Sequence, residues 1–269
     1  MDELSTVLMA LALGVMASAS LSDVRSREVS DIHWLAICCL GAVGALVTED
    51  LPTASWFLCS DLLLVLFMFW ERVSGIWSAI VLAASVALSA IPVIPYGHWS
   101  GLVTSVTSVA VAGLYYSGAI RGGADAKVLI SLSILCPTYS GFLCLIWSPH
   151  YLEALMFCPV LSILVLALIL SAAFLIPVVV RNIGSGVLGI SSYRCGIVEA
   201  RSGFVWPVED VVGGKVVRVR IPREKEKVLD RLEDYGCSDV AVTPMIPFIL
   251  PITAAFATVF VLGPPLPII

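Results

Sequence analysis

Long apolar segments take up most of this chain, and they constrain its fold more than any other feature. Segments of this length match the hydrocarbon thickness of a bilayer, where backbone groups must pair within the segment, so they are predicted to be transmembrane helices. The chain of 269 residues is 59% hydrophobic and only 13% charged, which fits the same class. The sequence therefore predicts an all-α polytopic membrane protein with about eight spans, or six spans plus an extra helical hairpin. The apolar segments lie at about residues 4–21, 33–48, 54–70, 76–95, 101–119, 127–147, 154–180 and 246–263.

The basic residues predict the orientation of these spans. When alternate connections are assigned to opposite sides, all 15 Lys and Arg residues fall on one side, which the positive-inside rule makes cytoplasmic. The amino terminus is then outside, and the first span is expected to be retained because its start is acidic rather than basic. We therefore expect a multi-pass protein of the cell membrane. The basic set is Arg25, Arg27, Arg72, Arg121, Lys127, Arg181 and every Lys and Arg from Arg194 to Arg231.

The one long polar segment, residues 181–243, is predicted to be a small cytoplasmic α+β domain before the last helix. Residues 203–206 and 215–221 resemble short strands, and Val240–Val242 is a possible third. A helix is expected from Pro222, ended by Gly236. The expected organisation is therefore catalytic transmembrane helices at 1–180, this domain at 181–243, and a last helix with its tail at 244–269. The basic residues of the domain at 181–243 are expected to face lipid head groups or a substrate, or, as is more common for charged segments, solvent.

Cysteine and histidine residues give no sign of a metal site. Six of the eight cysteines lie in apolar segments, where a free thiol behaves as a small hydrophobic group, and none forms a Cys-x-x-Cys pair. The histidines His33, His98 and His150 are scattered at the ends of different spans. We therefore expect no metal and no cofactor, and nothing suggests a nucleic acid partner.

Three aspartates are candidate functional residues. Placing a carboxylate inside a bilayer costs free energy, so a carboxylate found there is first considered as a functional group. Asp23 closes the first span and Asp125 lies between the fifth and the sixth, while Asp61 lies within the segment 54–70. A lone aspartate at a helix end is more often a cap or an interfacial anchor, and this is the favoured reading for Asp61.

Asp23 and Asp125 suit joint action. Two carboxylates in a poorly solvated site cannot both ionise easily, so the pair shares one proton. The ionised member can take a proton from water while the protonated one polarises a peptide carbonyl. The small residues Gly122, Gly123 and Ala124 leave room beside Asp125 for a substrate strand or a helix. Spacing alone does not show that the two aspartates meet.

Three motifs carry a family resemblance: DVRSREVSD at 23–31, GGADAK at 122–127 and VTPMIPF at 242–248. Together they resemble the type IV prepilin peptidases, and most closely the archaeal preflagellin peptidases, which are membrane aspartic proteases of the Gly-x-Gly-Asp class. The resemblance implies that Asp23 and Asp125 are the catalytic pair. It also implies cleavage of short basic leader peptides from archaellins or type IV pilin-like precursors at the cytoplasmic face.

The chain departs from this family in three ways. Ala124 stands where the class name has Gly, one more helical hairpin separates the two aspartates, and the paired cysteine motifs of the bacterial enzymes are absent. We therefore expect no methylation of the new amino terminus. Arg25, Arg27 and Lys127 either anchor the loops to lipid heads or tune the proton affinity of the pair, and anchoring is the favoured role.

Two other classes stay open. A presenilin-like or signal-peptide-peptidase-like intramembrane protease shares the same chemistry, and a proton-coupled transporter would use Asp61 and Asp125 as ion sites. The depth of Asp23 and Asp125 distinguishes them, because a leader peptidase needs these residues at the membrane interface and the other two need them buried in mid-membrane.

Overall fold

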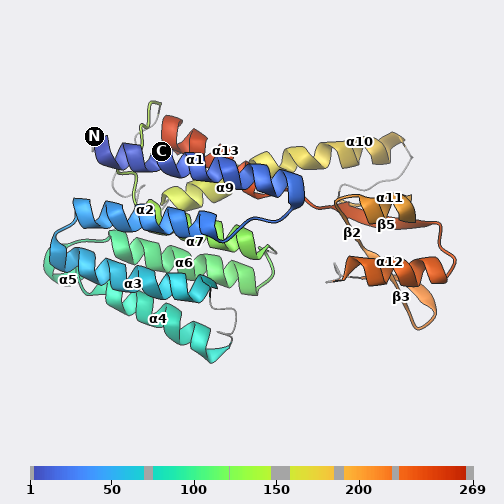
Figure 1. Ribbon diagram of the computed structural model, residues 1–269, viewed down its shortest axis with the longest axis horizontal. Helices are drawn as coiled ribbons and strands as arrows, with labels where there is room; N and C mark the ends of the chain where they lie inside the picture. Colours follow the sequence, from blue (N-terminus) through green and yellow to red (C-terminus); the bar gives the residue numbers. More distant parts are fainter. Residues whose placement is uncertain are drawn as a thin grey trace. The chain divides into compact units, whose positions relative to one another are not determined.

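A computed structural model describes residues 3–69, 75–120, 122–146, 158–184, 191–219 and 224–264. Arg72, Arg121, His150 and the expected helix start at Pro222 lie outside these ranges. The chain divides into two compact units, and each is described by itself below (Figure 1). The larger unit comprises Met1–Leu168 and Pro247–Ile269, and the smaller one Ile169–Ile246.

The larger unit is built from apolar helices that run side by side (Figure 1). Helix α1 packs against both α2 and α13, and α7 packs between α2 and α6. This brings the carboxyl end of the chain back against its first helix. The helices are α1 (Glu3–Ser26), α2 (Ile32–Thr48), α3 (Leu51–Phe69), α4 (Ile76–Ala90), α5 (Val93–Tyr96), α6 (Ser100–Tyr116), α7 (Gly123–Leu135) and α13 (Ile249–Leu262).

Helix α9 (Pro159–Ser171) crosses the division between the units. It continues through the 3-10 turn η1 (Ala172–Leu175) into α10 (Ile176–Gly184). Together they form the longest apolar helical stretch among the described residues, Pro159–Gly184. The predicted span 154–180 thus corresponds to one stretch with a tightened turn in its middle.

Four of the described helical stretches are long and apolar enough to cross a membrane: Glu3–Ser26, Leu51–Phe69, Ile76–Pro95 and Pro159–Gly184. Three further apolar helices are shorter, at Ile32–Thr48, Ser100–Tyr116 and Ile249–Leu262. The mostly helical architecture and the membrane character agree with the prediction. The number of spans and their orientation stay predictions.

The predicted span at 127–147 is wrong in its second half. Helix α7 ends at Leu135, and Cys136 leaves the helical conformation at φ −133° and ψ 71°. Pro137 explains the break, because proline restricts the residue before it and cannot donate the next helical hydrogen bond. The chain then runs beside the end of α13, where Leu143 and Leu145 donate backbone hydrogen bonds of 2.9 Å each. At 13 residues, α7 is only about 20 Å long.

Small and polar residues join the helices of the larger unit. The hydroxyls of Ser60, Ser85 and Ser105 are fully buried and lie within 2.8–3.0 Å of one another, so they link α3, α4 and α6. A Cβ atom on Gly41 of α2 would come within 2.8 Å of the carbonyl oxygen of Ile134 on α7. Close backbone approach and buried hydroxyl pairs are typical of helix packing in lipid.

The smaller unit contains two antiparallel sheets, one with the strand order β1-β5-β2 and the other a β3-β4 hairpin. Cys195 pairs with Val240 and Trp206 with Thr243 in the first sheet. The elements are β1 (Tyr193–Gly196), α11 (Ile197–Ser202), β2 (Val205–Pro207), β3 (Glu209–Val212), β4 (Lys215–Arg218), α12 (Lys225–Asp234) and β5 (Asp239–Pro244).

The strands expected near 203–206, 215–221 and 240–242 correspond to β2, β4 and β5, and α12 is followed by Gly236 at φ 86°. Strands β1 and β3 and helix α11 were not predicted. Four arginines of this unit bind acids of the same unit: Arg181 binds Glu199, Arg194 binds Asp239 and Glu209, Arg201 binds Glu226, Asp230 and Glu233, and Arg231 binds Asp210. These guanidinium groups are therefore occupied within the unit.

Candidate active site

Asp23 lies in the last turn of α1 and is only 8% exposed. Its Oδ2 accepts a hydrogen bond of 3.2 Å from the backbone N–H of Ile249, the first residue of α13. The first N–H groups of a helix have no acceptor within it, and the helix end carries partial positive charge. The start of α13 therefore supplies a fixed donor for the Asp23 carboxylate.

A hydroxyl pair fixes this donor against α1. The Oγ of Ser20 and the Oγ1 of Thr253 lie 2.7 Å apart in the core, one turn from Asp23 and from Ile249 respectively. Thr253 also donates to the carbonyl of Ile249 at 2.9 Å. The two helices are thus held in register at the point where Asp23 meets α13.

Asp125 is the third residue of α7, whose N-cap is Gly122. The backbone of Gly122 hydrogen-bonds the Asp125 carboxyl group, as the third residue does in a capping box. A Cβ atom on Gly122 would lie 2.3 Å from Oδ2 of Asp125, whereas one on Gly123 would meet only the Tyr115 hydroxyl at 3.8 Å. Gly122 therefore leaves room for the Asp125 carboxyl itself.

The two small residues that follow Gly122 differ in exposure, and the room that all three are expected to leave for a substrate stays a prediction. Gly123 is exposed, and Ala124 is half-buried against the hydrophobic core. Asp125 itself is half-buried at the start of α7. Of the three small residues, only Gly122 is required by the position of the carboxyl group.

Asp23 and Asp125 lie on helices that both pack against α2, and the charge of Asp23 acts on the carboxyl group of Asp125. Asp23 lies in the last turn of α1, whereas Asp125 lies in the first turn of α7. Each is held by a backbone donor of a helix start, which fixes its orientation. A pair of this kind can share one proton and activate a water molecule.

The basic residues near this site have separate roles. Nζ of Lys127 lies 2.7 and 2.8 Å from the two carboxylate oxygens of Asp31, which precedes α2, and 5.0 Å from the centre of the Phe69 ring. Lys127 thus binds a protein carboxylate in this structure, and its role as a lipid anchor stays a prediction. The charge of Arg27 acts on Asp23, while Arg25 is exposed in the last turn of α1.

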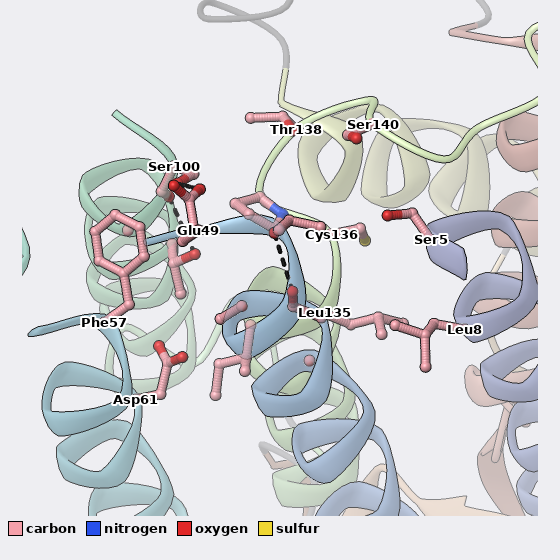
Figure 2. Close-up of a pocket in the computed structure, with 18 of the residues that line it drawn as sticks. Ser5, Leu8, Glu49, Phe57, Asp61, Ser100, Leu135, Cys136, Thr138 and Ser140 are labelled. Carbon is pink, nitrogen blue, oxygen red and sulfur yellow. Dashed lines mark hydrogen bonds between the residues drawn. The ribbon is translucent and has the colours of Figure 1, made fainter. Parts of the chain in front are cut away.

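Asp61 lines a cavity of about 300 Å³ formed by α1, α2, α3, α6 and the end of α7 (Figure 2). Glu49 also lines the cavity and binds Nδ1 of His98 at 2.9 Å and the Ser100 hydroxyl at 3.3 Å. Along α1, Ser5 on the cavity wall precedes Asp23 by 18 residues, or about 27 Å. The Ser5 wall of the cavity is thus distant from Asp23 along α1, and Asp61 lines this cavity; its favoured reading as a cap or interfacial anchor stays a prediction.

Two contacts of this site were not predicted. The first is the backbone N–H of Ile249. A backbone donor cannot be recognised from the residue type, although Ile249 directly follows the motif at 242–248. The second is the ion pair between Asp31 and Lys127. Asp31 belongs to the motif at 23–31, but nothing in the sequence indicates that it pairs with Lys127. Within the described parts of the chain, no group of three or more His, Cys, Asp or Glu residues is arranged to hold a metal ion.

The chain matches no model of a known protein family and shows no significant similarity to a curated protein. The features of the chain that bear on its function are therefore the three motifs and the surroundings of the two aspartates.

Proposed function

We propose that this chain is a membrane-embedded aspartic endopeptidase that removes short basic leader peptides from preflagellins or type IV pilin-like precursors at the cytoplasmic face. The observation that supports the proposal is the electrostatic effect of Asp23 on Asp125 within the larger unit, where each carboxyl group lies at a helix end. Their motifs resemble those of the prepilin peptidases, and both side chains have backbone donors that fix their positions. The partners are thus the precursor proteins and the lipid bilayer.

Catalysis requires no group beyond the pair and a water molecule. The ionised aspartate takes a proton from the water, whose oxygen adds to the scissile carbonyl carbon while the protonated aspartate donates to the carbonyl oxygen. Collapse of this intermediate breaks the C–N bond, and a proton passes to the leaving nitrogen. A precursor with an apolar helix in the membrane would present its leader bond just outside the bilayer, beside helix ends such as those that carry Asp23 and Asp125.

The experiment is cleavage of a pilin-like precursor with a basic leader by the purified full chain in detergent. Mass spectrometry of the new amino terminus identifies the cut. We expect cleavage by the wild type and by Asp61→Asn, and loss of more than 99% of the rate in Asp23→Asn and Asp125→Asn. Asp61→Asn is the matched control, because it makes the same change at a carboxylate of another helix, α3, which lines the cavity.

A presenilin-like protease would need the pair deep in the bilayer. Asp23 lies three residues before the end of α1, and Asp125 lies in the first turn of α7. These positions at helix ends favour the leader peptidase. Cleavage within the apolar helix of the substrate, instead of at its leader junction, would favour the presenilin-like class.

A proton-coupled carrier is the second candidate, and the cavity beside Asp61 is the observation that favours it. A carrier should lose proton-linked uptake in proteoliposomes on Asp61→Asn, and the folded wild type should leave leader substrates intact. Cleavage that survives Asp61→Asn would remove this candidate.

A further inference from the structure

The last helix, α13, contributes more to the surroundings of Asp23 than one backbone donor. Ile249, its first residue, is bonded through both of its backbone groups. Its N–H donates to Oδ2 of Asp23 at 3.2 Å, and its carbonyl oxygen accepts the hydroxyl of Thr253 at 2.9 Å. The hydroxyl of Ser20 lies 2.7 Å from that of Thr253 and can donate to it. These bonds form a chain that begins on α1 at Ser20 and returns to α1 at Asp23.

Helix geometry explains why these residues face one another. Ser20 and Asp23 are three residues apart on α1, so they lie on one face of that helix. Ile249 and Thr253 are four apart on α13 and likewise share a face. The two helices pack against each other along these faces (Figure 1). All four residues are buried, so little water competes for their hydrogen bonds.

Thr258 offers a comparison on the same helix. Its hydroxyl donates to the carbonyl of Ala254 at 2.8 Å, which is the same kind of bond that Thr253 makes to Ile249. Thr253 in addition contacts α1 through Ser20. In the part of the chain that the structure describes, the hydroxyl of Thr258 has no hydrogen bond to a second helix. The contact between helices, and not the bond along the helix, therefore distinguishes Thr253.

Resting on the proposed peptidase function, we infer that Ser20 and Thr253 are positioning residues for the cleavage reaction. They fix the start of α13 against α1, and the Ile249 N–H in turn fixes the orientation of the Asp23 carboxyl group. A carboxyl group that takes and gives a proton needs a fixed orientation, because a displacement of about 1 Å can cost about 100-fold in rate. The last helix is then part of the active site.

The first test observes the Ile249 N–H directly and does not use cleavage. Phe248-Ile249 is the single Phe-Ile pair in the sequence. The full chain, labelled with ¹³C-carbonyl phenylalanine and ¹⁵N-isoleucine, therefore gives one correlation peak in an NMR spectrum that links each amide to the preceding carbonyl. Asp23→Asn should move the proton resonance of this peak upfield, because a neutral amide oxygen is a weaker acceptor than a carboxylate. The peak then reports the bond to Asp23.

Variants of the hydroxyl pair are compared by the same peak. Thr253→Val and Ser20→Ala should each move the proton resonance in the direction that Asp23→Asn does. Thr258→Val, which removes the matched hydroxyl, should leave it in place. A peak that stays at the wild-type position in Thr253→Val, or that moves equally in Thr258→Val, would overturn the inference.

Leader cleavage gives the second test, with each rate normalised to the folded fraction of the protein. Thr253→Val should lower kcat by about 10-fold, with KM little changed, because it loosens the carboxyl group without removing it. Thr253→Ser keeps the hydroxyl and should cleave at close to the wild-type rate, although the loss of a buried methyl group makes it less stable. Thr258→Val should match the wild type.

The double variant Ser20→Ala/Thr253→Val separates positioning from stability. Removing one hydroxyl leaves its partner buried without that bond, whereas removing both is close to neutral for stability. We therefore expect the double variant to regain thermal stability relative to Thr253→Val but not to regain the rate. Recovery of stability and rate together would make the hydroxyl pair a structural contact only.

The proposed function and the positioning role fail separately. If the folded wild type cleaves no leader substrate, the proposed function fails, and the NMR peak still decides whether the hydroxyl pair holds the Ile249 donor on Asp23. If the wild type cleaves and Thr253→Val is equally fast, only the positioning role fails.

Discussion

Gly122→Ala is the sharpest test of how the site is built. The backbone of Gly122 lies at φ −83° and ψ 126°, which alanine adopts freely, so the substitution acts through its methyl group alone. This methyl group would lie 2.3 Å from Oδ2 and 2.8 Å from Cγ of Asp125, whereas ordinary contacts begin at 3.4 Å. The carboxyl group must therefore retreat by about 1 Å, and a misplacement of that size costs about 100-fold in rate.

Gly123→Ala is the matched control for this substitution. Its methyl group would meet only the Tyr115 hydroxyl at 3.8 Å, and alanine is the better helix former at this position. We expect leader cleavage by Gly123→Ala within a few-fold of the wild type, with Gly122→Ala about 100-fold slower and equally well folded in detergent. Equal rates for the two variants would show that the position of the Asp125 carboxyl group does not matter for the reaction.

Two further predictions concern stability. Gly41→Ala should lower the free energy of unfolding by about 1–3 kcal/mol, because its methyl group would press on the Ile134 carbonyl of α7 at 2.8 Å. Thermal unfolding in detergent measures this, and Gly44→Ala, whose methyl group meets a side chain at 3.5 Å, should be nearly neutral; equal losses would contradict the packing argument. In the smaller unit, the hydrogen bonds from Arg231 lower the pKa of Asp210 below its ordinary value. The ion pair therefore stabilises the unit above about pH 4, the ordinary carboxyl range, and this stability is lost as the pH falls further. Asp210→Asn removes the titrating group. Protection of the unit from protease should then depend less on pH between about pH 5 and pH 3 than it does in the wild type. Unchanged acid dependence would show that the pair adds nothing to stability.

The main helices of the larger unit could be predicted because each lies in a continuous apolar run, and α1, α3 and α4 lie in runs long enough to cross a bilayer. α7 shows where this reasoning fails. The apolar run continues to residue 147, but Pro137 stops the helix, and hydropathy does not register the missing backbone donor. β1 was missed for a different reason. It is four residues long and pairs with β5, more than 40 residues later, so no local pattern identifies it.

The residues of the candidate site could be found from their motifs, but their contacts could not. Asp23 and Asp125 were selected as rare acids beside small or basic residues, and their relative position depends on how α1 and α7 each pack against α2. The donor from Ile249 is a backbone group, which any residue at that position would supply. Gly122 was predicted to give room to a substrate, whereas its small size first serves the adjacent carboxyl group.

Asp125 could serve as a structural cap of α7 or as a catalytic acid, and two variants distinguish these roles. In Asp125→Asn the amide oxygen can still accept the hydrogen bond of Gly122, so the cap survives while the titrating proton is lost. In Asp125→Leu both are lost, at a cost of about 0.5–2 kcal/mol for the cap. We therefore expect thermal stability close to the wild type in Asp125→Asn and lower in Asp125→Leu, with cleavage absent from both. Full cleavage by Asp125→Asn would make Asp125 a structural cap, because a capped helix start needs no acid but the transfer of a proton to the carbonyl oxygen does.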